Sequence, residues 1–314
     1  MSNDPSRPAR VCELPPPVRP GARVGVAALS GPAEPARIER GLAALGELGF
    51  DPVPAANLRH RDGLYAGVDG ERLEAFHALA ADPSIEAICF IRGGYGLMRL
   101  LPRFDWELLA RHPRVYVGYS DLTPFLLEIN RRLGLVAFHG PMVAADLARG
   151  LADDERDSLL GALAGEYPAE LPVRTGEDTR FRDPVAGPLA GGCLSLLTSV
   201  LGTPWAPALG GSLLFLEDVD EPLYRLDRML THLRLSGTLA SVSAMIFGHL
   251  GCLDAPERDT LVCPQALREG IADLGLPVAW GVPAGHSTPN YTLPLGLASR
   301  LEPGRGRLLL GVEP

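Results

Sequence analysis

The residue best suited to act as a nucleophile is Ser120, in the stretch Val115-Tyr-Val-Gly-Tyr-Ser-Asp-Leu-Thr-Pro124. A β-branched and aromatic run ends at Gly118, and a helix start follows Ser120. A strand, a tight turn, a serine and a helix start expose a hydroxyl beside free backbone N–H groups. The sequence therefore predicts a serine nucleophile. Two observations favour an ordinary N-cap serine instead: such caps are common, and Leu122 replaces the second glycine of G-x-S-x-G.

A serine nucleophile needs a base, and the base needs a carboxylate that orients it. Three of the seven histidines directly follow an apolar run or a short Gly/Pro turn: His139, His249 and His286. His286 is the most loop-like of them, in Gly281-Val-Pro-Ala-Gly-His-Ser-Thr-Pro-Asn290, and a rigid loop suits a fixed imidazole. Glu217 follows the apolar run 212–216 and is the candidate carboxylate. A charge that caps the next helix is the competing interpretation of Glu217.

The glycine loop Arg92-Gly-Gly-Tyr-Gly96 directly follows the apolar run 85–91. Glycines there permit backbone turns that are closed to other residues and let a ligand approach closely. An oxyanion hole needs two N–H donors, and we expect one from Asp121 and the other from Gly94. A plain tight turn and a phosphate-binding loop are the alternatives. No Lys-Ser/Thr pair follows, which argues against the phosphate-binding loop.

Short apolar strands alternate with helical periodicity through the first half of the chain. We predict strands over 23–29, 85–91, 115–118 and 135–139, and helices around 38–48, 70–81 and 122–133. This alternation predicts a parallel sheet with helices on both faces. Ligands bind such sheets beyond the carboxyl ends of the strands, so we expect the glycine loop and Ser120 to face one pocket.

The second half has a weaker helical pattern and more strand-like runs. We predict a helix after Gly191-Gly-Cys193, a helix over 222–235, strands over 212–216, 244–247 and 277–280, and a hairpin of 295–301 with 307–312. The polar stretch before this half has no long apolar period. The predicted organisation is a flexible tail over 1–20, an α/β domain over 21–150, a linker over 151–183 and a second domain over 184–314.

Composition excludes several classes of function. The net charge of −9 provides no basic footprint for nucleic acid, and no apolar run approaches the roughly 20 residues of a membrane span. The polar, Pro- and Arg-rich N-terminus argues against a secretory signal. Five cysteines without a C-x-x-C pair suggest reduced, cytoplasmic thiols and no zinc site. No G-x-G-x-x-G follows the first strand, so we expect no dinucleotide cofactor.

Several short motifs follow one another along the chain. They are Arg92-Gly-Gly-Tyr-Gly96, Gly118-Tyr-Ser-Asp121, Phe138-His-Gly-Pro141, Leu216-Glu-Asp-Val219, Tyr224-Arg-Leu-Asp-Arg-Met-Leu230, Gly285-His-Ser-Thr-Pro-Asn290 and Leu293-Pro-Leu-Gly296. Each motif is weak alone, but the ordered set spans nearly the whole chain from about Gly21. In the types and the order of these motifs, the chain resembles the LD-carboxypeptidase family (serine peptidase family S66), which includes the microcin C7 self-immunity peptidases.

The resemblance implies a Ser–His–Glu triad with Ser120 as nucleophile, His286 as base and Glu217 as its carboxylate. It implies oxyanion donors at Gly94 and Asp121, and we expect substrate contacts from Arg92, Gly93 and Tyr95. It implies an α/β fold with a flavodoxin- or Rossmann-like N-terminal domain, a smaller β-rich α/β C-terminal domain and a homodimer. Neither metal nor cofactor is implied.

The implied activity is cleavage of an L,D-peptide bond next to a free carboxylate, as in cytoplasmic murein tetrapeptide recycling. One departure from the family is Gly191-Gly-Cys-Leu194, where Gly-Gly-Asn-Leu is common. Two alternatives remain open. The same triad could act on a peptidyl- or aminoacyl-nucleotide, which aromatic residues such as Trp205 or Trp280 in the pocket would favour. The fold could also serve a catalytically silent binding protein.

Overall fold

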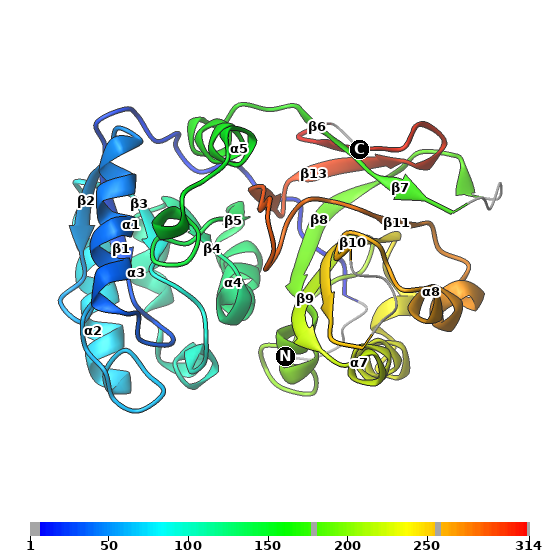
Figure 1. Cartoon of the computed structure of the whole chain (residues 1–314), viewed down its shortest axis with the longest axis horizontal. Helices are drawn as coiled ribbons and strands as arrows, with labels where there is room; N and C mark the ends of the chain where they lie inside the picture. Colours follow the sequence, from blue (N-terminus) through cyan, green and yellow to red (C-terminus); the bar gives the residue numbers. More distant parts are fainter. Residues whose placement is uncertain (1–6, 177–180, 255–258, 313–314) are drawn as a thin grey trace. The chain divides into compact units, whose positions relative to one another are not determined.

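The computed structural model of the chain describes residues 7–176, 181–254 and 259–312. Its contacts divide the chain into two units, whose elements are labelled in Figure 1. The N-terminal unit comprises Leu14–Glu166 and Tyr291–Leu293. The C-terminal unit comprises Met1–Glu13, Tyr167–Asn290 and Pro294–Pro314. Neither unit is therefore one continuous segment of the sequence.

The N-terminal unit is built on a six-stranded sheet with the order β12-β5-β4-β3-β1-β2. The strands of this sheet are β1 (Arg23–Ala27), β2 (Asp51–Pro54), β3 (Ile85–Phe90), β4 (Val115–Gly118), β5 (Ala137–His139) and β12 (Leu293–Leu295), of which β12 has only Leu293 within this unit. The pairs from β2 to β5 are all parallel. The order 2-1-3-4-5 is that of flavodoxin-like sheets, in which ligands bind where the winding reverses, between β1 and β3. The predicted parallel α/β architecture is confirmed.

Five helices accompany this sheet: α1 (Pro35–Glu47), α2 (Asp69–Ala81), α3 (Trp106–Arg111), α4 (Thr123–Leu133) and α5 (Asp153–Ala164). Helices α2, α3 and α4 pack against one another in turn, and α4 also packs beside β5 (Figure 1). Phe125 of α4 is fully buried, with its ring centroid 5.6 Å from those of Phe76 and Phe90, both nearly edge-on. This aromatic cluster anchors α4, which begins after the turn Ser120–Leu122.

The C-terminal unit contains an eight-stranded mixed sheet with the order β6-β14-β13-β8-β9-β10-β11-β7. Its strands are β6 (Ala169–Pro172), β7 (Arg174–Thr175), β8 (Val185–Cys193), β9 (Leu213–Glu221), β10 (Ala244–Cys252), β11 (Val278–Trp280), β13 (Ala298–Glu302) and β14 (Arg307–Leu310). The neighbours β8, β9, β10 and β11 run parallel, and β13 and β14 form the predicted antiparallel hairpin. The prediction of a β-rich α/β unit is confirmed.

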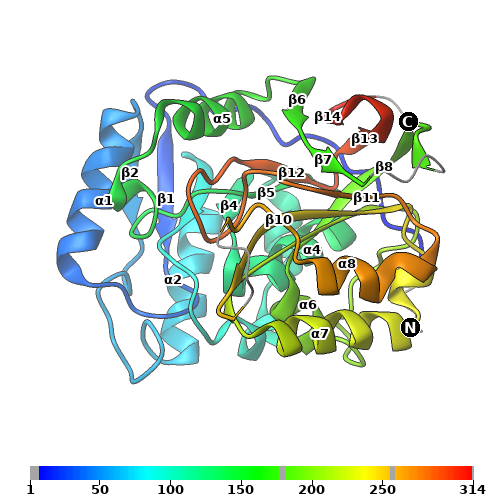
Figure 2. The same cartoon turned by 45° about the vertical axis from the view of Figure 1, so that its right-hand side comes forward.

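The described residues of this unit contain three α-helices: α6 (Leu194–Ser199), α7 (Leu223–Leu235) and α8 (Gln265–Ile271). Helix α6 begins directly after the glycines of β8, as predicted, and α7 lies side by side with α8 (Figures 1 and 2). The strand predicted to stop at Leu216 is longer than expected, because β9 continues to Glu221. Glu217 therefore lies within a strand and does not begin a helix.

The segment predicted to be a flexible tail is packed over its described residues 7–20. The Ala9 N–H donates to the Gly210 carbonyl at 2.7 Å, and the Cys12 N–H donates to the Gly296 carbonyl at 2.9 Å. Within the N-terminal unit, the Val18 N–H donates to the Leu163 carbonyl at 2.8 Å. These are main-chain contacts, so polar and Pro-rich side chains do not prevent them.

The stretch predicted as a linker, 151–183, also contains regular structure over its described residues. Helix α5 belongs to the N-terminal unit, and β6 and β7 belong to the sheet of the C-terminal unit. The inner face of α5 is short, with Leu159, Ala162 and Leu163 buried, and its exposed face carries the ion pair of Arg156 with Asp153. The short apolar stripe explains why periodicity did not reveal this helix.

No helix in the described part of the chain is long and apolar enough to span a membrane. All five cysteines lie among the described residues, and none of them forms a disulfide.

Candidate active site

Ser120 lies in a strained turn between β4 and α4. Its backbone φ is +63°, in the left-handed region that a serine adopts at a cost of about 1–3 kcal/mol. A short 3₁₀ turn, Ser120–Leu122, leads into α4, whose N-cap is Leu122. The interpretation of Ser120 as a helix N-cap is therefore wrong. A strained serine between a strand and a helix is the geometry of a nucleophile elbow.

Two glycines leave room for this turn. A Cβ at Gly118 would lie 2.8 Å from the Phe90 ring, and a Cβ at Gly93 would lie 2.7 Å from the Ser120 Cβ. Leu122, at the position of the second elbow glycine, is fully buried. The glycine that lets a neighbouring backbone pass close to the serine is therefore Gly93 of the neighbouring loop, and not residue 122.

Asp121 connects the Ser120 turn to the glycine loop. Its carboxylate is buried and accepts a hydrogen bond from the Leu97 N–H at 2.9 Å. Burial raises the pKa of the Asp121 carboxyl, while the hydrogen bond from the Leu97 N–H acts in the opposite direction. The Asp121 side chain thus supports the turn from inside.

The glycine loop follows β3 and lies against the loop that follows β1. The Gly31 N–H donates to the Gly93 carbonyl at 3.1 Å, and Gly94 and Gly96 have φ of +109° and +119°. Arg72, fully buried on α2, donates to the carbonyls of Leu29 and Gly96 and is paired with Asp69. Sequence reasoning missed Arg72, because a helical arginine carries no signal of burial. Its contacts fix both loops at the β1/β3 reversal.

The three residues predicted to contact substrate have different environments. Gly93 is buried beside Ser120, whereas Arg92 is exposed and donates to the Pro32 carbonyl at 3.2 Å. The Tyr95 side chain is also exposed, and its ring stacks on Tyr65 with centroids 5.9 Å apart. A cation and an aromatic ring are therefore exposed on the loop that touches Ser120.

In the C-terminal unit, Glu217 and His286 form a hydrogen-bonded pair. The Glu217 side chain is fully buried in β9, and its Oε2 lies 2.7 Å from His286 Nδ1. The same oxygen accepts the main-chain N–H of His286 at 3.2 Å. A carboxylate on Nδ1 fixes the tautomer and leaves Nε2 as the basic nitrogen. The interpretation of Glu217 as a helix cap is wrong.

The other two histidines considered as the base, His139 and His249, are buried in the protein. His139 is fully buried, with its ring centroid 5.4 Å from that of Tyr119. Both ring nitrogens of His249 have hydrogen-bond partners, namely Thr260 Oγ1 at 2.7 Å and the Pro289 carbonyl at 2.9 Å. Of the three, His286 is the partly exposed imidazole that is paired with a buried carboxylate.

Cys193, at which the sequence departs from the resemblance described above, lies opposite Glu217 in the β8–β9 register. Its thiol donates to Asp218 Oδ1 at 3.7 Å. Burial, followed by the negative charges of Glu217 and Asp218, raises the pKa of the Cys193 thiol well above its usual range. A thiol held in its protonated form is a poor nucleophile. Cys193 thus acts as a buried polar neighbour of Glu217.

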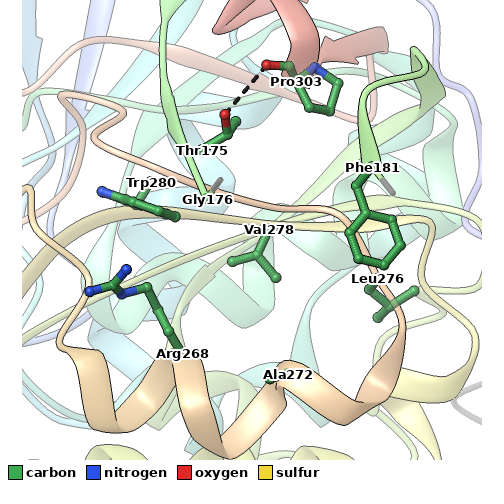
Figure 3. A pocket seen from close by; sticks show the side chains of 9 residues that line it. All are labelled: Thr175, Gly176, Phe181, Arg268, Ala272, Leu276, Val278, Trp280 and Pro303. Carbon is green, nitrogen blue, oxygen red and sulfur yellow. Dashed lines mark hydrogen bonds between the residues drawn. The ribbon is translucent and has the colours of Figure 1, made fainter. Parts of the chain in front are cut away.

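A separate apolar cavity of about 200 Å³ lies between β11 and α8 in the C-terminal unit (Figure 3). Its walls include Val278 and Leu276, and the Arg268 guanidinium lies 5.0 Å from the centroid of the Trp280 ring. None of the residues predicted for the catalytic site lines it. Trp280, which we considered as a possible contact for a nucleotide base in the catalytic pocket, contributes to this cavity instead.

Both halves of the chain match known families. Residues 24–140 match the family model of the LD-carboxypeptidase N-terminal domain, and residues 186–301 match that of the LD-carboxypeptidase C-terminal domain. The chain belongs to the LD-carboxypeptidase family. It is therefore a hydrolase of the serine carboxypeptidase type.

Named relatives cover most of the chain. A probable murein peptide carboxypeptidase of Bacillus subtilis (strain 168) is 34% identical over 281 residues, covering 88% of this chain and 87% of that protein. The crystal structure of muramoyltetrapeptide carboxypeptidase from Oxalobacter formigenes superposes with a TM-score of 0.83 at 30% identity, covering 93% and 100%. The microcin C7 self-immunity protein MccF in complex with aspartyl sulfamoyl adenosine superposes with a TM-score of 0.85 at 26% identity, covering 96% and 99%.

Proposed function

We propose that the chain is a murein tetrapeptide carboxypeptidase that uses Ser120, His286 and Glu217 as a catalytic triad. The observation that carries the proposal is the hydrogen bond of 2.7 Å between buried Glu217 and His286 Nδ1, which orients Nε2 as a base. The strained turn at Ser120 supplies the nucleophile. The proposal combines one residue of the N-terminal unit with two of the C-terminal unit.

In the proposed reaction, His286 Nε2 removes the proton of Ser120 as its oxygen attacks the carbonyl of the L,D-peptide bond. Backbone N–H groups of Gly94 and Asp121 stabilise the oxyanion. His286 then protonates the departing amine of the terminal D-residue, and an acyl-enzyme remains on Ser120. Water, deprotonated by His286, hydrolyses that ester and regenerates the hydroxyl.

The glycine loop is the proposed binding element for the substrate. A free α-carboxylate next to the cleaved bond requires a cation, and Arg92 is exposed on this loop. Tyr95 offers an exposed ring for the peptide beside it. Gly93 lets the substrate backbone approach Ser120 closely. We further propose a cytoplasmic location and a homodimer, as in the sequence-based prediction.

The murein substrate is tested by a side-by-side assay of murein tetrapeptide and an aminoacyl sulfamoyl adenosine. We expect the higher kcat/KM with the tetrapeptide, because murein carboxypeptidases are among the more identical relatives and Trp280 lines a separate cavity. A higher kcat/KM with the adenosine would favour the second candidate, an immunity-type peptidase, which the likeness to MccF supports.

A fluorophosphonate probe, which reacts with activated serines, separates an enzyme from a silent binding protein. We expect labelling of the wild-type protein that disappears in Ser120→Ala and falls sharply in His286→Ala. Because these two residues belong to different units, dependence of Ser120 labelling on His286 would also test their cooperation. Labelling that is equal in all three proteins would contradict the triad.

Gly93→Ala tests the close approach of the glycine loop to the nucleophile. The new Cβ would meet Ser120 Cβ at 2.7 Å and Oγ at 2.8 Å, so one of the two backbones must move. We expect the fluorophosphonate labelling rate to fall by about tenfold or more, and stability by about 1–3 kcal/mol, as for other overpacked sites.

The matched control is Gly70→Ala on α2, where a Cβ would meet nothing within 4 Å. We expect this control to label at the wild-type rate. Its free energy of unfolding should rise by up to about 1 kcal/mol, since alanine has a higher helix propensity than glycine. Wild-type labelling of Gly93→Ala would show that the glycine is dispensable.

A further inference from the structure

The loop that carries His286 is closed by hydrogen bonds at both of its ends. We define the His286 loop as residues 284–290. The Gly285 N–H donates to Asn290 Oδ1 at 2.9 Å across the base of the loop. The neighbouring strand β10 holds the loop through His249, whose main-chain N–H donates to the Ala284 carbonyl at 3.0 Å. The His286 loop therefore has a fixed position within the C-terminal unit.

The side chain of His249 makes the second contact of β10 with this loop. His249 is 2% exposed, and its Nε2 lies 2.9 Å from the Pro289 carbonyl oxygen. A carbonyl oxygen only accepts hydrogen bonds, so Nε2 carries the proton. Nδ1 is hydrogen-bonded to the Thr260 hydroxyl at 2.7 Å. Both ring nitrogens of His249 are therefore engaged, and the proton on Nε2 is held by the Pro289 carbonyl.

We propose that His249 is a positioning residue for His286, which it serves by holding the Pro289 carbonyl. This inference rests on the proposed function, in which His286 is the base. The two contacts of His249, at Ala284 and Pro289, lie on either side of His286 along the loop. Glu217 holds Nδ1 of the His286 ring, so the position of the loop determines where Nε2 lies.

Loss of the Pro289 contact should therefore affect the rate more than the affinity. Misplacing a catalytic group by about 1 Å costs on the order of 10²-fold in rate. Loss of a residue that orients a metal ligand typically costs about 10- to 100-fold in metal affinity or activity. We expect the same range for kcat when His249 can no longer reach Pro289, with KM largely unchanged, because the contacts described for His249 are to Thr260 and to the main chain of the His286 loop.

Two amide variants separate positioning from mere filling of the site. In His249→Gln, the amide nitrogen can take the place of Nε2 and donate to the Pro289 carbonyl. In His249→Asn, the amide is one methylene shorter and reaches Thr260 but not Pro289. We expect His249→Gln to retain kcat within about threefold and His249→Asn to lose about 10- to 100-fold. His232→Ala, an exposed histidine of the same unit, is the matched control and should retain wild-type kcat.

A spectroscopic measurement follows His286 directly. In ¹⁵N-histidine-labelled protein, the proton between His286 Nδ1 and Glu217 should give a resonance that is retained in His249→Gln and shifted or broadened in His249→Asn. Thermal unfolding of each variant shows that it is folded. Wild-type kcat and an unchanged resonance in His249→Asn would overturn the positioning role, as would equal losses of kcat in both amide variants.

Activity of His286→Ala distinguishes failure of this inference from failure of the proposed function. If His286→Ala is inactive and His249→Asn is fully active, only the positioning role is wrong. If His286→Ala retains wild-type kcat, the proposed function is wrong, and the role of His249 in catalysis is wrong with it.

Discussion

Ser120→Ala is expected to abolish hydrolysis of a murein tetrapeptide while the protein stays folded. Without the hydroxyl no acyl-enzyme can form, and removal of a serine nucleophile costs on the order of 10⁶-fold in kcat. Ser120 is partly exposed, and alanine removes one atom, so we expect a change in unfolding free energy of at most about 1 kcal/mol. Mass spectrometry measures the release of the terminal D-residue. Thermal unfolding shows whether the variant is folded.

Ser120→Gly provides a second inactive variant that cannot fail through strain. Ser120 has a φ of +63°, which glycine adopts without penalty, so this variant should be at least as stable as the wild type. Ser199→Ala, at an exposed serine of α6, is the control and should retain full activity. Substantial hydrolysis by both Ser120 variants would show that another residue is the nucleophile.

Elements with a strong apolar period and clear end signals were predictable from the sequence. Helix α4 shows this best: its buried stripe begins after the Ser120 turn, and it ends at Gly134, whose φ is +66°. Strand β2 was missed because its sequence, Asp-Pro-Val-Pro, contains two prolines. Such a strand is tolerated here because β2 lies at the edge of the sheet, where one set of hydrogen-bonding groups has no strand to pair with.

The packed N-terminal segment could not be predicted in the same way. Its contacts are hydrogen bonds of main-chain groups, such as that of the Ala9 N–H to Gly210, more than 200 residues away in the sequence. A main-chain donor leaves no residue type that a sequence pattern could detect. The composition of this segment predicted a flexible tail, whereas its described residues 7–20 are held by main-chain hydrogen bonds.

In the candidate site, too, some features could be predicted from the sequence and others could not. Residue types with chemical potential, such as Ser120, Glu217 and His286, were visible because each follows a strand or a short turn. The supporting roles of the residues that hold them were not visible. Buried Arg72 looks like an ordinary member of a helix, and His249 was visible only as a candidate base; among the partners of both are carbonyl oxygens of distant residues. Sequence types thus indicate the chemistry, whereas the supporting contacts depend on the tertiary structure.

The parallel sheet of the N-terminal unit explains why its part of the site has this form. At the β1/β3 reversal, the loops after both strands point beyond the same edge, which leaves a place for a ligand. In this chain, the Gly31 N–H joins the two loops through the Gly93 carbonyl, and Gly93 touches Ser120 after the next strand. Three successive strand ends therefore converge on the proposed nucleophile.

Glu217→Gln is expected to lower kcat by between about 10² and about 10⁴-fold without unfolding the protein, the upper figure being the loss for a comparable Asp→Asn change in a serine protease. Glu217 Oε2 faces two donors of His286, namely Nδ1 and the main-chain N–H. A glutamine that turns its carbonyl oxygen towards both donors keeps the tautomer and the loop, whereas one that turns its NH₂ group towards Nδ1 imposes the wrong tautomer, which is the cause of the upper figure. In either orientation, the negative charge that stabilises the imidazolium formed in each step is lost.

Glu217→Ala should lose more than Glu217→Gln, in both rate and stability. It leaves two N–H donors of His286 without their acceptor, at a cost of about 1–3 kcal/mol for each buried donor. It also opens a cavity beside Gly285, where a Cβ would meet Glu217 Oε2 at 2.6 Å. The measurements are kcat, KM and thermal unfolding, with Glu269→Gln on the exposed side of α8 as the control. Wild-type kcat in Glu217→Gln would exclude a charge on Glu217 from the mechanism, and equal rates in the two variants would show that orientation of His286 does not depend on this hydrogen bond.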